Sequence, residues 1–133
     1  MTNVDLADKV GISAPPCLRR VRALEKAGYL TGYHADVDSA KLGFTVTVFA
    51  MVGLHSQADK DLQAFEELVR SWPEVRECHM LNGDIDFILK CVSEDLSSFQ
   101  MFLTQKLTPA PNVANVKTSL TIRQTKKQPG VPL

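Results

Sequence analysis

A change of hydrophobic period at residue 44 constrains the fold of this chain more than any other feature. From Phe44 to Leu54 apolar residues occupy every second position, which is typical of a strand with one buried face. Apolar spacing downstream predicts helices over 58–73 and 95–107 and further strands over 75–81, 85–92 and 116–124. The predicted order over residues 44–125 is therefore strand, helix, strand, strand, helix, strand.

This order favours an α+β fold of the ferredoxin-like βαββαβ type. Two helices on one face of a four-stranded antiparallel sheet bury the apolar faces of all six elements. Phe49 and Met51 would then lie on the sheet face that no helix covers. Because no remaining segment can cover them, we expect a second copy to pack there as a homodimer, sheet against sheet.

The pair Asn82-Gly83 predicts a tight turn between the second and third strands. A two-residue turn would place Met80 opposite Ile85 and His79 opposite Asp86. The imidazole and the carboxylate would share the face opposite Cys78. They could bind the ammonium group of a ligand or simply hydrogen-bond each other.

The first 28 residues predict two short helices joined by Gly11-Ile12-Ser13. The second helix has apolar residues at one face, at Cys17, Val21, Leu24 and Gly28. Since proline disfavours the α region for the residue before it, we expect Ala14 and Pro15 to be extended and the helix to span residues 16–27. Residues 29–43 form a strand or a connector.

The charges are unevenly distributed. The chain has 15 basic and 15 acidic residues, which excludes a uniformly basic nucleic-acid binder. Residues 1–35 nevertheless carry five basic against three acidic groups, and four of the basic groups lie between Arg19 and Lys26. A basic run alone is typical of a solvated helix face, but the tight connection and the two apolar stripes favour a helix-turn-helix. Its second helix would enter the DNA major groove.

The geometry of such a helix divides the candidate DNA ligands into two groups. We expect base contacts from residues near the helix start and on its outer face, namely Pro15, Leu18, Arg19 and Arg22. We expect phosphate contacts from Ser13, Arg20 and Lys26. A serine at this position would ordinarily cap the helix, but Pro15 and Pro16 have no N–H to donate, so the Ser13 hydroxyl is free for a phosphate.

Catalysis, metal binding and membrane insertion are not expected. Cys78 and His79 are adjacent on a strand and point to opposite faces, so they cannot form a nucleophile–base pair. The three histidines make no zinc pattern, and no cofactor motif is present. No apolar run is long enough to span a bilayer. Three scattered cysteines fit a reducing compartment, so we expect a cytoplasmic protein.

Two segments resemble the Lrp/AsnC, or feast/famine, family of regulators. Asn3–Tyr33 is similar to their DNA-binding segment, and Glu77–Lys90 resembles the signature of their effector-sensing domain. The resemblance covers nearly the whole chain in the family's order. It implies a transcription factor that binds double-stranded DNA, dimerises through its sheet domain, assembles into octamers or discs and responds to an amino acid. It also implies an effector pocket at a contact between dimers, with ligands at Gly83, Asp84, Asp86, Thr118, Ser119 and Thr121.

The chain departs from this family at its start. Family members have a further helix before the first helix of this chain, so we expect a truncated winged helix-turn-helix with Leu6, Val10, Val21 and Leu24 exposed. A stand-alone amino-acid-binding and oligomerisation module without DNA binding is the alternative. The expected domains are a DNA-binding region, a connector, an effector-binding and oligomerisation domain and a loose tail: 1–33, 34–43, 44–125 and 126–133.

Overall fold

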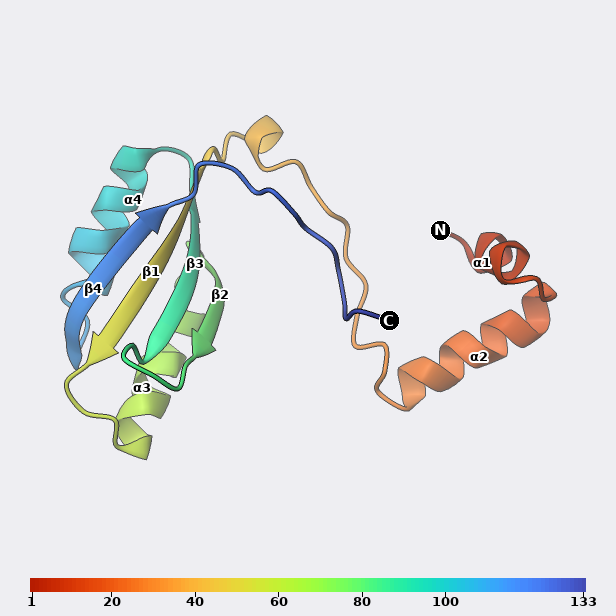
Figure 1. The fold of residues 1–133 in the computed structure, drawn as a ribbon, viewed down its shortest axis with the longest axis horizontal. Helices are drawn as coiled ribbons and strands as arrows, with labels where there is room; N and C mark the ends of the chain where they lie inside the picture. The colour runs from red at the N-terminus through yellow and green to blue at the C-terminus, as the bar shows by residue number, and fades with distance from the viewer. The chain divides into compact units, whose positions relative to one another are not determined.

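The computed structural model describes all 133 residues, which form two compact units, Met1–Val37 and Asp38–Leu133 (Figure 1). The first unit holds α1 (Asn3–Val10) and α2 (Ala14–Lys26). The elements of the second, in chain order, are the short 3₁₀-helix Ala40–Leu42, β1 (Val46–Leu54), α3 (Asp59–Arg70), β2 (Val75–Met80), β3 (Phe87–Ser93), α4 (Leu96–Phe102), the π-helical turn Leu103–Leu107 and β4 (Val113–Leu120). None of the helices combines the length and the hydrophobicity that a membrane span needs.

Local chemistry sets the ends of the two N-terminal helices. Thr2 caps α1 in a reciprocal capping box with Asp5, and Gly11 ends it in the left-handed conformation, at φ 75°. The predicted start of α2 is wrong by two residues, because Ala14 and Pro15 are already helical. The first-turn N–H groups of a helix have no intrahelical partner, so the tandem prolines fit there without losing a hydrogen bond.

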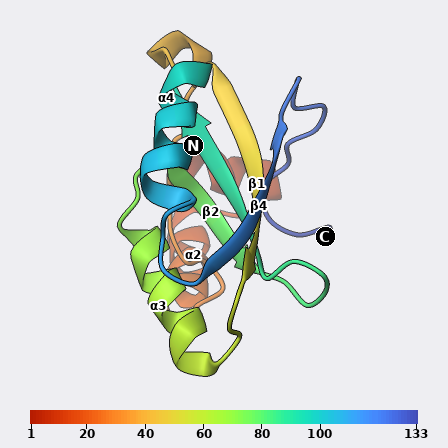
Figure 2. The ribbon, with the colours of Figure 1, turned by 90° about the vertical axis from the view of Figure 1, so that its left-hand side faces the viewer.

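The four strands form an antiparallel sheet in the order β2-β3-β1-β4, which confirms the predicted ferredoxin-like fold. Figure 2 shows α3 and α4 on the same side of this sheet. The core lies between the two helices and the sheet. There Val52, Leu89 and Leu107 are fully buried, and Phe65 packs on Phe87 with ring centroids 4.9 Å apart.

The uncovered sheet face has an apolar centre with charged groups around it. Phe49 pairs with Lys90 and Ser119 in the neighbouring strands, and Met51 pairs with Ile88 and Lys117. Directly paired residues share a face, so these side chains all lie opposite the helices. Phe49 is 36% exposed. The structure therefore places Phe49 and Met51 on the uncovered face, as predicted.

Several strand boundaries differ from the sequence prediction: β1 and β3 each begin two residues later than predicted, at Val46 and Phe87. β4 covers Val113–Leu120 and not 116–124, so Ile122 lies beyond the strand and is 96% exposed. In this register residue 122 falls opposite Val46, the first residue of β1, so residues 123 and 124 have no strand residue to pair with. Residues 29–39 contain no strand, so the segment left open as strand or connector is a connector that includes the Ala40–Leu42 turn.

Candidate nucleic-acid and effector sites

The first unit is built on a small buried contact between α1 and α2. Ala7 and Cys17 are 2% and 3% exposed, and the Asn3 side-chain amide donates to the Ala14 carbonyl oxygen at 3.1 Å. The apolar faces of both helices are only partly covered beyond this contact. Val10 is 57% and Leu24 43% exposed, as expected, whereas Leu6 and Val21 are half-buried.

The outward face of α2 carries the predicted DNA ligands on one stripe. Spacings of three or four residues align Pro15, Leu18, Arg19, Arg22 and Lys26 along the helix, and all five are exposed. The cationic side chains at 19, 20, 22 and 26 take part in no hydrogen bond or ion pair within the chain. The only carboxylate on α2, that of Glu25, accepts a hydrogen bond from the Tyr33 hydroxyl at 3.1 Å. This face is therefore cationic and unneutralised.

Ser13 occupies the N-cap position of α2, with extended backbone angles. Its side chain makes no capping hydrogen bond, as the sequence predicted from the missing N–H groups of Pro15 and Pro16. The hydroxyl is exposed at the positive end of the helix dipole. An anionic oxygen is the kind of partner that this position favours.

The turn between β2 and β3 is longer than predicted. Met80 pairs with Phe87 and His79 with Ile88, a register two residues away from that of an Asn-Gly turn. The N–H of Leu81 donates to the Asp86 carbonyl oxygen at 2.8 Å, which closes a loop over residues 82–85. The predicted pairing of His79 with Asp86 is therefore wrong, and the ligand site drawn from it is not formed.

Asp86 instead ties this loop to the end of β1. Its Oδ2 atom accepts from the Leu54 N–H at 2.7 Å and from the Gln57 Nε2 at 3.3 Å, while its own N–H donates to the Val52 carbonyl oxygen at 3.0 Å. These contacts compete with a tight Asn-Gly turn and account for the longer loop. No sequence signal indicated Gln57 as a partner. Asp84, by contrast, is exposed and holds no hydrogen bond.

His79 lies on the uncovered sheet face in a small charged cluster. Its Nε2 is 3.3 Å from Glu77 Oε1, and Lys90 Nζ is 3.5 Å from the other carboxylate oxygen of Glu77. The hydrogen bond with His79 and the charge of Lys90 lower the pKa of the Glu77 carboxyl. This cluster flanks the apolar centre around Phe49.

The predicted effector residues do not meet within one subunit. Gly83, Asp84 and Asp86 lie at the end of the sheet where β1 finishes, whereas Thr118 pairs with Ala50, Ser119 with Phe49, and the Thr121 N–H with the Thr47 carbonyl oxygen. Ala50 and Leu54 are four positions apart along β1, a distance of about 13 Å. Thr118 and Ser119 also point to opposite faces. A site that uses both groups needs more than one subunit.

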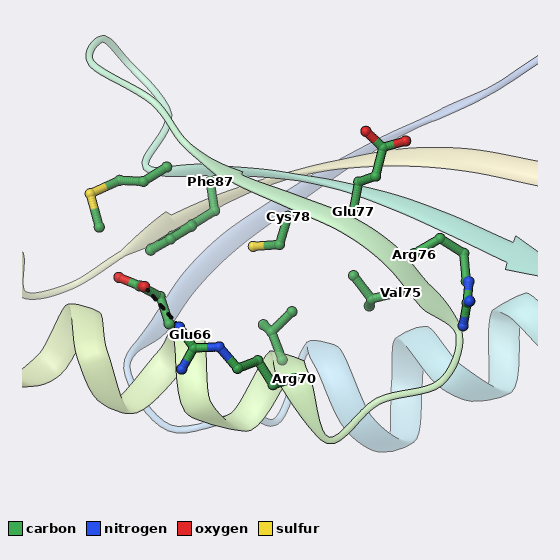
Figure 3. A pocket seen from close by; sticks show the side chains of 9 residues that line it. Glu66, Arg70, Val75, Arg76, Glu77, Cys78 and Phe87 are labelled. Atoms are coloured by element: carbon green, nitrogen blue, oxygen red, sulfur yellow. Dashed lines mark ion pairs between the residues drawn. The ribbon is translucent and has the colours of Figure 1, made fainter. Parts of the chain in front are cut away.

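A groove between α3 and β2 was not indicated by the sequence. It has a volume of about 290 Å³, with Val75 and Phe87 among its apolar lining and the Glu66–Arg70 ion pair, 3.7 Å long, at its rim (Figure 3). Cys78 points into the groove and Glu77 points away from it, so adjacent residues of β2 do face opposite ways. Burial raises the pKa of the Cys78 thiol to about 11, which disfavours the thiolate that a nucleophile requires.

Comparison with known proteins covers both units. Residues 1–31 match a family described as winged helix-turn-helix DNA-binding, and residues 47–131 match the Lrp/AsnC ligand binding domain. The leucine-responsive regulatory protein of Rhizobium meliloti is 54% identical over 95% of this chain and 81% of its own length. The Bkd operon transcriptional regulator of Pseudomonas aeruginosa is 40% identical over 97% of this chain and 84% of its own length.

A solved structure has the same fold throughout. The crystal structure of a transcriptional regulator from Neisseria meningitidis in complex with L-methionine superposes with a TM-score of 0.93 at 30% identity, covering 99% of this chain and 85% of that one. These relatives are regulators and not enzymes, and a helix-turn-helix accompanies the ligand-binding domain, which favours a regulator over a stand-alone binding module. The chain therefore belongs to the Lrp/AsnC family of DNA-binding transcriptional regulators.

Proposed function

We propose that α2 is the recognition helix of this regulator and that its outward stripe lies in the DNA major groove. Pro15, Leu18, Arg19 and Arg22 contact base edges, and Ser13, Arg20 and Lys26 contact phosphates. Arginine can donate two hydrogen bonds to the O6 and N7 atoms of a guanine, which gives Arg19 and Arg22 the capacity to specify sequence. Residues 1–33 form the DNA-binding domain, and residues 34–43 connect it to the regulatory domain.

The main support for this proposal is the unneutralised positive charge of α2. Four cationic side chains lie on α2 without a carboxylate partner, and Tyr33 holds the single nearby acid, Glu25. A cationic surface that the protein does not neutralise itself is complementary to the phosphates of a duplex.

A DNA site for the experiment is obtained by selecting bound duplexes from a random pool. Base contacts and phosphate contacts can then be distinguished by comparing variants on this selected site and on a scrambled duplex. Arg19→Ala and Arg22→Ala should each relax the preference at one base pair, at a cost of roughly 1–3 kcal/mol on the selected site. Arg20→Ala serves as the matched control, because a lost phosphate contact weakens selected and scrambled duplexes equally. An equal loss on all duplexes for all three variants would refute this division of roles.

We further propose that an α-amino acid is the effector and that the loop over residues 81–86 takes part in binding it. The related regulator from Neisseria meningitidis binds L-methionine. In this chain Asp84 offers a free carboxylate for an ammonium group, and Asp86 keeps its second oxygen, Oδ1, without a partner. Ser119 and Thr121 complete the site from a neighbouring subunit.

A thermal-shift screen of the amino acids identifies the effector, and Asp84→Asn tests the site. Loss of the ammonium contact should weaken binding of that amino acid without changing the stability of the free protein. Asp59→Asn, an exposed position at the start of α3, is the control that removes an equal charge. If both variants bind the amino acid as the wild type does, the loop is not the site.

The assembly that this function requires is a homodimer through the uncovered sheet face, with higher assembly up to an octamer. An apolar centre around Phe49 with charged groups at its edge has the composition of a subunit interface. Two copies would present two recognition helices to successive turns of a duplex. Because the target is DNA, we place the regulator in the cytoplasm, where the three free cysteines stay reduced. No cofactor is needed.

A further inference from the structure

The C-terminal quarter of the chain is its most basic part. Residues 96–133 contain five basic residues and no aspartate or glutamate, whereas residues 38–95 contain eleven acidic and five basic residues. The recognition-helix unit has no such excess, since its own acids offset most of its basic groups. The second unit is therefore strongly divided in charge along its sequence.

Two of the five basic residues lie within the regular elements of the second unit. Lys106 pairs with Glu74 at 2.8 Å, and Lys117 lies on the uncovered sheet face opposite Met51. The other three, Arg123, Lys126 and Lys127, all lie in the exposed segment after β4. Arg123 and Lys126 make no hydrogen bond or ion pair within the chain. The charges of Arg123 and Lys126 are thus presented to solvent.

The segment is anchored at one end and irregular beyond it. The Thr121 N–H donates to the Thr47 carbonyl oxygen at 2.8 Å, which fixes the segment where β4 ends. Residues 122–129 form no helix or strand, and Pro129 disfavours the extension of β4 beyond them. Six residues from Thr121 to Lys127 can span roughly 20 Å when extended. The charges can therefore reach a surface some distance from the sheet.

We propose that residues 122–127, the basic tail, form a second DNA contact that binds phosphates without regard to sequence. The inference rests on DNA binding as the function of this chain. Arginine donates in pairs to phosphate oxygens and lysine acts as a point charge, while the neighbouring Gln124 and Thr125 add uncharged donors. A segment with several cations and no carboxylate is complementary to a uniformly anionic polymer and has no residue that would repel it. The tail supplements α2 by adding affinity, while α2 supplies the sequence preference.

The test is the salt dependence of DNA affinity for the full chain. Each phosphate contact adds about 0.9 to the slope of log affinity against log salt concentration. The double variant Arg123→Gln/Lys126→Gln should lower the magnitude of this slope by about 1.8 for each bound subunit. The loss of affinity should be the same on a selected site and on a scrambled duplex, so the ratio between them stays at its wild-type value.

The matched control is Lys41→Gln/Lys60→Gln, which removes the same charge from two exposed positions outside the tail. Its slope should stay close to that of the wild type. An unchanged slope in the tail variant, or an equal change in the control, would overturn the proposal. Because all four substituted positions are exposed, both variants should keep the wild-type melting temperature. A lower melting temperature in the tail variant would show that its substitutions act on folding and not on a phosphate contact.

The acidic surface of a second copy is the competing partner for the tail. If that partner is the correct one, the tail variant changes the assembly state in analytical ultracentrifugation and leaves the salt slope unchanged, and the proposal is overturned. A wild-type chain that binds no DNA would overturn the proposed function and this inference together. A wild-type chain that binds DNA, with a tail variant that binds identically, would overturn this inference alone.

Discussion

The Asp86 carboxylate offers the sharpest prediction about the regulatory unit, because two hydrogen bonds converge on one of its oxygens. Asp86→Ala leaves the Leu54 N–H, now bonded at 2.7 Å, without an acceptor at the end of β1, and it frees the Gln57 side chain. A hydrogen bond to a charged group contributes about 1.5–3 kcal/mol, and an unpaired, half-buried N–H adds a desolvation cost. Since Asp86 is itself partly exposed, we expect a net loss of about 2 kcal/mol in the free energy of unfolding.

This loss corresponds to a large change in melting temperature. The unit spans residues 38–133, and for a domain of this size 1 kcal/mol shifts the midpoint by about 4–8 °C. Asp86→Ala should therefore melt roughly 10 °C below the wild type in calorimetry at fixed protein concentration. Asp86→Asn, which keeps one acceptor oxygen, should fall between the two.

Asp84→Ala is the matched control from the same loop. Its side chain is exposed and makes no hydrogen bond, so its removal should change the free energy of unfolding by less than about 0.5 kcal/mol. If Asp86→Ala is as stable as Asp84→Ala, the carboxylate does not hold the loop to β1. The length of the β2–β3 loop would then have a different cause.

Three further predictions concern the sheet. Phe49→Lys places a charge at the centre of the uncovered face and should convert the proposed dimer into monomers in sedimentation velocity, whereas dimers that persist would exclude this face as the interface. Burial raises the pKa of Cys78 to about 11 and that of Cys91 to about 12, so the folded state retains thiol protons that the unfolded state releases from about pH 9. The free energy of unfolding measured in urea should therefore fall above pH 9, and it should fall less steeply in Cys78→Ala. If the wild type and Cys78→Ala show the same pH dependence, the burial of this thiol does not contribute. A Cβ on Gly53 would lie 2.9 Å from the side-chain amide of Asn115, which is exposed and can turn away, so Gly53→Ala should change the free energy of unfolding by less than about 0.5 kcal/mol; a loss of about 2 kcal/mol in urea unfolding would refute this.

The features of the sequence that depend on burial predicted the fold well. Val48, Ala50 and Val52 alternate with Phe49 and Met51 along β1, and the structure buries the first set under the helices. The spacing of apolar residues follows from which face of a helix or strand packs against the core. The same signal therefore also predicted α3 and α4 and their position on one face of the sheet.

Errors arose where a local preference competed with a tertiary contact or with helix-end chemistry. Asn82-Gly83 favours a two-residue turn, but the bonds from Asp86 to the end of β1 stabilise a longer loop and move the register by two residues. The rule that proline disfavours the α region for the residue before it led to a predicted start of α2 that is two residues too late. The first-turn positions of a helix need no N–H donor, so the prolines are accepted there. Neither the Gln57 contact nor the groove beside Cys78 has a sequence signature, because each joins segments distant in the chain.

Interference by guanine N7 methylation tests most directly whether α2 lies in the major groove. A selected duplex is lightly methylated, and the molecules that the full chain still binds are separated and cleaved at the modified bases. Arginine contacts to guanine edges predict that methylation blocks binding at guanines grouped in two half-sites, about 10–10.5 base pairs apart or a multiple of that spacing. Arg22→Ala should lose one interfering guanine in each half-site. Binding that tolerates methylation at every guanine would contradict recognition of DNA by this helix.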